Sequence, residues 1–326
     1  MLAYAIRRIL VSVPILVFAT FVVFAMVSLS GDPLSELKTR NPPPPPRTLE
    51  LEAQRLRLDE PLLVRYWHWL TGVIRGDFGP SVQSTQEIGP ELADRFLVTF
   101  RLIAVAMLLA LLLAVLVGVI SAVKQYSGID YTFTFSGFLF LSMPSFWFAI
   151  LLKEAGISFN DAVGKQVLFT IGDSSVYVEG GTWASFVDIL GHMILPTISL
   201  AMLTFAAWSR FQRAAMLEVL NSDYVRLARA KGLRRGKVMT RHALRTALIP
   251  LTTVTALDLG SIIYGAIVTE NVYQWRGAGS FLLESVQRYD VYAVAGWLLI
   301  AATFVILFNL AADLLYAVLD PRIRYA

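Results

Sequence analysis

The chain is dominated by six long stretches of apolar residues that contain almost no charge. Each stretch is 21 to 23 residues long, and only the fifth contains an acid, Asp258. About 20 apolar residues in a helix cross the hydrocarbon core of a bilayer, and the helix satisfies its own backbone hydrogen bonds where lipid offers none. The sequence therefore predicts an all-α polytopic membrane protein with six transmembrane helices, over Ile9–Leu29, Leu102–Val123, Tyr131–Leu152, Ile189–Ser209, Ala247–Thr269 and Val291–Ala312.

The segment 31–98, between the first two expected spans, is too long to be a simple connector. Five consecutive prolines, Pro42–Pro46, predict extended polyproline II, which serves best as a stiff spacer. Pro61 suits the first turn of a helix, and the aromatic and apolar residues after it follow at helical spacing. Such a helix either anchors at the membrane interface, where tryptophan and tyrosine are enriched, or offers Trp67 and Trp69 to an external partner. The sequence leaves both interpretations open.

Composition agrees with a membrane protein and removes several classes of chemistry. Hydrophobic residues make up 56% of the 326 residues and charged residues only 16%, against about 25% charged in soluble domains. Mean hydropathy is +0.62. The absence of cysteine excludes disulfides, thiolate metal sites and cysteine nucleophiles. The three histidines stand far apart in the sequence, which disfavours a zinc site.

Positive charge is concentrated in one loop and sets the expected orientation. The net charge is +4, and the segment 210–245 holds ten lysines and arginines against two acids. Lysine and arginine mark the cytoplasmic side of short membrane loops. If the spans alternate, Arg7, Arg8 and Lys124 fall on that same side, together with Arg322 and Arg324 of the tail. We therefore expect both termini in the cytoplasm.

The expected spans divide the chain into three parts. The first span is expected to stay on the chain rather than be cleaved, because it exceeds a normal signal-peptide core and no A-x-A site follows. Residues 1–30 then form a cytoplasmic N-terminus and the first span, and 31–98 form an extracytoplasmic segment. Residues 99–326 form a core domain with the basic cytoplasmic loop at 210–248.

Within this loop a short helix is expected. Asn221-Ser222-Asp223 supplies candidate N-caps, and Gly232 is a natural stop because glycine accepts the left-handed conformation. Ala228 and Gly232 are four residues apart, which leaves one face open to close backbone approach. A second basic helix is expected over Lys237–Leu248. Charge alone favours a topology signal, ahead of binding to anionic lipid or to nucleic acid.

Polar residues inside the expected spans are candidates for structure or function. Asp258 lies near the centre of its span, where a charge is costly, and is either a pore-lining or an interhelical group. Pro144 and Pro196 should kink their helices. Asn309 and Asp313, one turn apart near the inner end of the last span, are expected to be structural. His192, and His68 in the segment 31–98, are expected to be hydrogen-bonded interface residues rather than ligands or proton relays.

The order of residues in the basic loop resembles the EAA loop of bacterial ABC importer permeases, and most closely the B-type subunit of the dipeptide and oligopeptide branch. The loop motifs are Asp223–Leu233, Arg241–Arg245 and Ile249-Pro250. Similar motifs run along the rest of the chain, namely Arg7–Leu10 with Pro14, Leu58–Pro61, Tyr66, Trp69, Gly76–Gly79, Met143–Trp147, His192–Pro196, Asn309, Asp313 and Asp320–Arg322. Arg226 stands where the wider motif has glutamate, and Arg276 stands where the branch usually has proline.

The resemblance implies a type I ABC importer permease fold in the bacterial inner membrane. It also implies that the short helix is a coupling helix, which enters a cleft on a separate ATPase through Tyr224, Val225, Ala228, Arg229, Ala230 and Gly232. The implied partners are a C-type permease subunit in a heterodimer, two ATPase subunits or one dual ATPase, an extracytoplasmic peptide-binding protein and membrane lipid, without nucleic acid. No cofactor is expected on this chain, since ATP and Mg²⁺ would bind the ATPases.

Other functions remain as alternatives at this stage. Similar permeases handle nickel chelates, glutathione or sugars, so the sequence does not name the substrate. An ion-coupled secondary transporter would show internal repeats and discontinuous helices at the membrane midplane, and a membrane enzyme would show paired carboxylates or clustered histidines. Neither pattern is evident in the sequence. It also lacks the G-x-x-x-x-G-K-[ST] motif, so we do not expect an enzyme that hydrolyses ATP.

Overall fold

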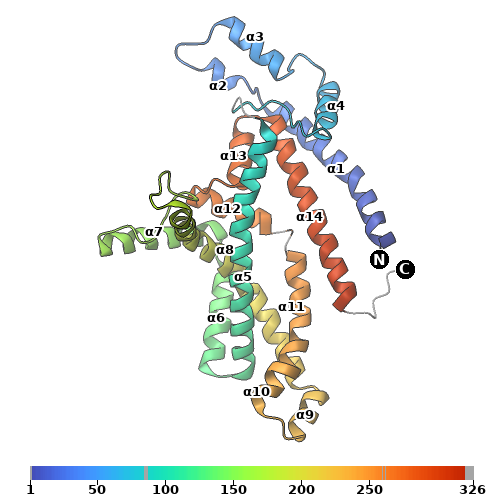
Figure 1. The fold of residues 1–326 in the computed structure, drawn as a ribbon, viewed down its shortest axis with the longest axis vertical. Helices are drawn as coiled ribbons and strands as arrows, with labels where there is room; N and C mark the ends of the chain where they lie inside the picture. Colours follow the sequence, from blue (N-terminus) through green and yellow to red (C-terminus); the bar gives the residue numbers. More distant parts are fainter. Residues whose placement is uncertain (1, 84–86, 259, 261, 320–326) are drawn as a thin grey trace. The chain divides into compact units, whose positions relative to one another are not determined.

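The computed structural model describes residues 2–83, 87–258, 260 and 262–319 (Figure 1). Regular secondary structure in these residues is helical throughout. The chain divides into two compact units, residues 1–99 with 276–307 and residues 100–275 with 308–326. Residues 276–307, which were assigned above to the core domain, therefore belong to the first unit. The predicted tail residues Asp320, Pro321, Arg322 and Arg324 lie outside the described residues.

The first unit contains the N-terminal helices and the segment 31–98. Its helices are α1 (Leu2–Ser30), α2 (Ser35–Lys38), α3 (Pro46–Arg55), α4 (Leu62–Val73) and α13 (Ala278–Gln287), with the first parts of α5 (Ile88–Val123) and α14 (Val291–Leu319). An aromatic cluster fills its interior. The ring centroid of Phe24 lies 5.5 Å from that of Tyr66, 6.0 Å from that of Trp69 and 5.8 Å from that of Tyr292. These rings join α1, α4 and α14.

A buried carboxylate links two distant segments of the first unit. Asp290, at the start of α14, accepts hydrogen bonds from the Ser81 hydroxyl and the Val82 backbone amide, both at 2.7 Å. Burial raises the pKa of the Asp290 carboxyl above its usual value, although these hydrogen bonds act in the opposite direction. The chain after α4 is thereby held against the start of α14.

The second unit is built around α8 (Gly181–Leu220), which contacts α6 (Gly128–Ser142), α7 (Ser145–Val163) and α11 (Arg245–Asp258). The other elements of this unit are α9 (Asp223–Ala230), α10 (Arg235–Lys237), the π-helix η1 (Val238–Leu244), α12 (Ile262–Tyr273) and the remaining parts of α5 and α14. α8 begins and ends well beyond the expected span Ile189–Ser209. Arg210 and Arg213, counted above as loop charges, are therefore helical.

Among the described residues, four helices are long and apolar enough to cross a membrane, and two bent pairs raise the number of candidate spans to as many as six. The expected span Tyr131–Leu152 is broken next to Pro144, where a kink was expected, into the end of α6 and the start of α7. α6 and α7 meet at 109°, because proline lacks the N–H of a helix and pushes the preceding residue into extended geometry. Met143 accordingly has ψ 132°. The expected span Ala247–Thr269 is also divided, into α11 and α12 at 64°.

Prolines elsewhere have different effects. Pro196 lies inside the 40-residue α8 and does not end it. Pro46 begins α3, so the prediction of extended structure through all five prolines is wrong at its last residue. Proline is tolerated at the first position of a helix because its missing N–H has no partner there. The predicted helix after Pro61 is confirmed as α4.

Candidate functional site

The short helix predicted in the basic loop is present as α9 (Figure 1). Ser222 is its N-cap residue in extended geometry, but its hydroxyl donates to the Val219 carbonyl at 2.6 Å instead of capping the helix. Gly232 follows the helix with φ +76° and donates its amide to the Arg229 carbonyl at 3.0 Å. This left-handed residue ends the helix as predicted, since it carries no Cβ to strain the backbone.

The inner face of α9 packs against its own chain. Val225 is fully buried and Ala228 nearly so, in a cluster formed with residues of α5, α8, η1 and α11, namely Ala122, Ala215, Met216, Val238, Ala243 and Ala247. Residues three apart lie on the same face of a helix. The structure therefore places Val225 and Ala228 in the interior of the second unit. The predicted bare face at Ala228 is not exposed, because the chain covers it.

The opposite face of α9 is open and combines apolar and basic side chains. Tyr224 is 45% exposed and Leu227 is 56% exposed. Arg226, Arg229, Ala230 and Lys231 are exposed beside them. We call this set the outer face of α9. No atom of the described residues lies within 4 Å of a Cβ built at Gly232, so the end of the helix is also open. An apolar centre bordered by positive charge suits contact with a protein surface that carries acidic groups.

An ion pair between a buried carboxylate and a partly exposed guanidinium holds the helices that support α9. The Arg213 guanidinium on α8 donates from Nε to Asp130 Oδ1 and from an Nη to Oδ2, both at 2.8 Å. The same Nε lies 3.0 Å from the Ser121 hydroxyl on α5, which donates to Asp130. The paired fork fixes the relative position of α5, α6 and α8 at this end of the unit. Sequence reasoning missed this pair because Arg213 was counted among the loop charges.

The connection after α9 contains a π-helix. The predicted basic helix Lys237–Leu248 forms as α10, η1 and the start of α11, and the seven residues of η1 are Val238–Leu244. η1 contacts both α9 and α11. π-Helical turns are rare and are frequently found at functional sites. They leave no signal in the periodicity of a single sequence, so this feature could not be predicted.

Asp258 makes an interhelical contact. Its Oδ2 accepts a hydrogen bond of 2.7 Å from Nε1 of the buried Trp208 on α8. This contact joins α11 to α8 next to the bend between α11 and α12. This hydrogen bond agrees with the interhelical role predicted for Asp258. The pore-lining role stays a prediction.

The two tryptophans proposed for docking lie on different sides of α4. Trp67 is 62% exposed, whereas Trp69 is only 3% exposed and donates from Nε1 to the Phe78 carbonyl at 3.1 Å. Trp69 is therefore a core residue of the first unit and does not face an external partner. His68 and His192 are hydrogen-bonded as expected. His68 pairs with Glu60 at 3.0 Å, and Nδ1 of His192 lies 3.0 Å from the Asp188 carbonyl.

Comparison with known families decides what this helical chain is. Residues 114–325 match the family described as binding-protein-dependent transport system inner membrane component, and residues 1–103 match the N-terminal domain of the same component. The chain belongs to this family. With its candidate spans, this member of the binding-protein-dependent transport family is an integral inner membrane protein. α9 and its outer face lie within the first matched region.

Full-length relatives within this transport family are permeases of peptide systems. The chain is 38% identical over 324 residues to an oligopeptide transport system permease protein of Mycobacterium tuberculosis, with 99% of both chains covered. It is 37% identical over 341 residues to a dipeptide transport system permease protein of Escherichia coli, covering 100% of this chain and 99% of the relative. An oligopeptide transport system permease protein of Bacillus subtilis is 35% identical to this chain over 330 residues, and the alignment covers 100% of both chains. The resemblance to B subunits of peptide permeases is thereby confirmed.

Proposed function

We propose that this chain is the B-type permease subunit of an ATP-driven peptide importer. It would form half of the translocation path and transmit the motion of an ATPase through the outer face of α9. The observation that carries the proposal is the similarity to peptide permeases over the whole chain, at 35% to 38% identity. Both the segment 31–98 and the basic loop fall within these alignments.

The geometry of α9 supports a mechanical role. The inner face of the helix is anchored by Val225 and Ala228, so α9 moves with the ends of the helices on which it packs. A push on Tyr224 or Leu227 is passed to α8 through this packing, and the Asp130–Arg213 pair passes it to α5 and α6. Closely packed interiors transmit such displacements because they compress little.

The other components follow from this role. A C-type permease would supply the second half of the path, and two ATPase subunits or one dual ATPase would bind and hydrolyse ATP with Mg²⁺. An extracytoplasmic binding protein would deliver the peptide. The chain itself would need no cofactor and catalyse no reaction, and its membrane-facing helices would contact lipid.

Assembly and uptake test this proposal. The chain should be expressed with the C-type permease and ATPase genes of its operon, and purified through a tag on this chain alone. We expect both ATPase and second permease to co-purify, and reconstituted vesicles to take up labelled peptides only with ATP and the binding protein. Uptake driven by an ion gradient without ATP, or purification without any ATPase, would contradict the proposal.

The orientation gives a separate prediction. The chain has no cysteine, so Thr48→Cys on α3 and Thr240→Cys on η1 each introduce one exposed thiol. In intact cells an impermeant maleimide should label the cysteine at position 48 and not the one at position 240. After permeabilisation both should react. The reverse pattern in intact cells would overturn the assignment of 31–98 to the outside.

A further inference from the structure

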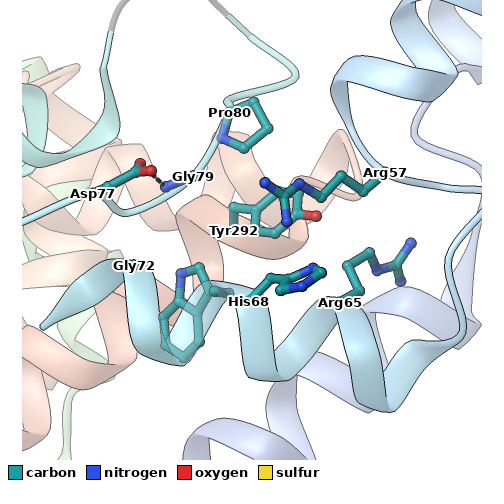
Figure 2. Close-up of a pocket in the computed structure, with 9 residues that line it drawn as sticks. Arg57, Arg65, His68, Gly72, Asp77, Gly79, Pro80 and Tyr292 are labelled. Carbon is teal, nitrogen blue, oxygen red and sulfur yellow. Dashed lines mark hydrogen bonds between the residues drawn. The ribbon is translucent and has the colours of Figure 1, made fainter. Parts of the chain in front are cut away.

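A small pocket lies in the first unit, between α4, the turn after α3 and the start of α14 (Figure 2). Its volume is about 50 Å³. The basic side chains that line it are Arg57, Arg65 and His68. Figure 2 shows the Arg57 side chain reaching across toward Tyr292, with His68 on the opposite wall. The proposed function does not use this pocket.

The pocket has more hydrogen-bond donors than acceptors. Among the described residues, no hydrogen bond or ion pair engages the exposed Arg57 guanidinium. Arg65 is only 8% exposed and donates to the Ser28 hydroxyl at 2.7 Å, but its buried Nε has no hydrogen-bond partner in the described part of the chain. The exposed Arg57 guanidinium is therefore the donor that an incoming acceptor can reach, whereas the buried Arg65 adds its positive charge to the wall of the pocket.

The nearby acids do not neutralise these donors. Asp77 lines the pocket, and its Oδ1 accepts the Gly79 backbone amide at 2.8 Å. The lining itself carries two arginines against one carboxylate, an excess of one positive charge, and Glu60 outside the lining is hydrogen-bonded to His68. A group with a single negative charge matches this excess.

Arg57 also occupies an unusual backbone position. Its φ is +54°, a left-handed conformation in the turn that follows α3. Glycine or asparagine would adopt this conformation with less strain. An arginine at this place suggests that its side chain is required, and the side chain extends into the pocket.

We infer that this pocket binds a single carboxylate, carried by an aspartate or glutamate side chain of the extracytoplasmic binding protein. The inference rests on the proposed function, since it requires 31–98 to be outside and a protein partner to be present. A carboxylate meets a guanidinium through two parallel hydrogen bonds. The volume admits a group the size of a few water molecules and excludes a whole peptide residue.

The shape of the pocket favours a protein side chain over other carriers of charge. A side-chain carboxylate arrives on an unbranched CH₂ stem. The terminal carboxylate of a peptide is attached to a branched carbon, and a lipid phosphodiester carries substituents on two oxygens. Both need more room beside the charged group.

The test uses the complete transporter in lipid nanodiscs and measures the affinity of its binding protein. Arg57→Gln should weaken binding about tenfold, the usual effect of losing a charged hydrogen bond. Arg57→Lys keeps the charge but loses the fork, so its loss should be smaller. Arg47→Gln is the matched control, because Arg47 is exposed on α3 and does not line the pocket. Propionate should compete with the binding protein for the wild type but not for Arg57→Gln, at ionic strength held constant with sodium chloride.

Three results would overturn the inference. Equal affinity of the wild type and Arg57→Gln would remove the site. Reduced peptide uptake with unchanged affinity for the binding protein would assign the carboxylate to the peptide. An effect of Arg57→Gln confined to nanodiscs with anionic phospholipid would assign the pocket to a lipid headgroup. In all three cases the wild type would still import peptides, whereas failure of the proposed function would abolish uptake in the wild type itself.

Discussion

Leu227→Asp should leave the chain folded in the membrane but reduce peptide uptake by tenfold or more. Leu227 is 56% exposed on the outer face of α9, so aspartate costs the isolated chain little. If an ATPase covers this face, the new carboxylate must lose its water without gaining a partner, which costs several kcal/mol. The measurement is ATP-dependent uptake in vesicles, together with the amount of ATPase retained during purification.

Two further variants separate contact from folding. Leu227→Ala removes apolar area without adding charge and should reduce uptake less than Leu227→Asp. Val225→Asp places the same carboxylate on the buried face of α9 and should prevent the chain from accumulating at all. A Leu227→Asp transporter that takes up peptides like the wild type, with its ATPases bound, would show that the outer face is not the contact.

Arg213→Ala should destabilise the chain, because it leaves the buried Asp130 carboxylate without its cation; the cost of about 3–5 kcal/mol for a fully buried pair is the upper bound, since Arg213 is partly exposed. Asp130 is buried, and without Arg213 it keeps the Ser121 hydroxyl and one backbone amide as donors. The loss should appear as a lower midpoint of thermal unfolding of the purified chain. Uptake should fall in proportion to the folded fraction.

The neighbouring arginine provides the control. Arg210 is exposed and lies with its guanidinium 4.3 Å from the centroid of the Phe138 ring. Arg210→Ala should therefore cost only about 1 kcal/mol. The double variant Asp130→Ala with Arg213→Ala should be more stable than Arg213→Ala alone, because no charge is left buried without a partner. An Arg213→Ala chain that unfolds at the wild-type temperature would contradict the structural role of the pair.

The parts of the fold predicted from the sequence are those that depend on local pattern. The long apolar stretches without charged residues located the helices α1, α5, α8 and α14, and Gly232 located the end of α9. Proline chemistry accounts for the break at Pro144, but the sequence did not reveal whether that break would bend the helix slightly or by 109°. The angle is set by what α6 and α7 pack against, which is a property of the tertiary structure.

In the candidate site, too, the sequence predicted what depends on local pattern and not what depends on tertiary packing. Helical spacing placed Ala228 and Gly232 on one side of α9, yet spacing alone does not say whether that side faces a partner or the chain itself. Burial of Val225 and Ala228 decides the question, because it leaves Tyr224 and Leu227 on the open side. Trp69 was misjudged for a similar reason, since the ring lies among Phe24 and Tyr66, and these contacts join residues far apart in the sequence.

Photo-cross-linking is the sharpest test of whether the outer face of α9 contacts an ATPase. A benzophenone maleimide attached to Leu227→Cys, in a chain that otherwise has no cysteine, reacts only with surfaces in direct contact. We expect a covalent product with the ATPase subunit from position 227, and none from the same probe on Thr48→Cys in α3. No ATPase product from position 227 in an assembled, transporting complex would contradict such a contact.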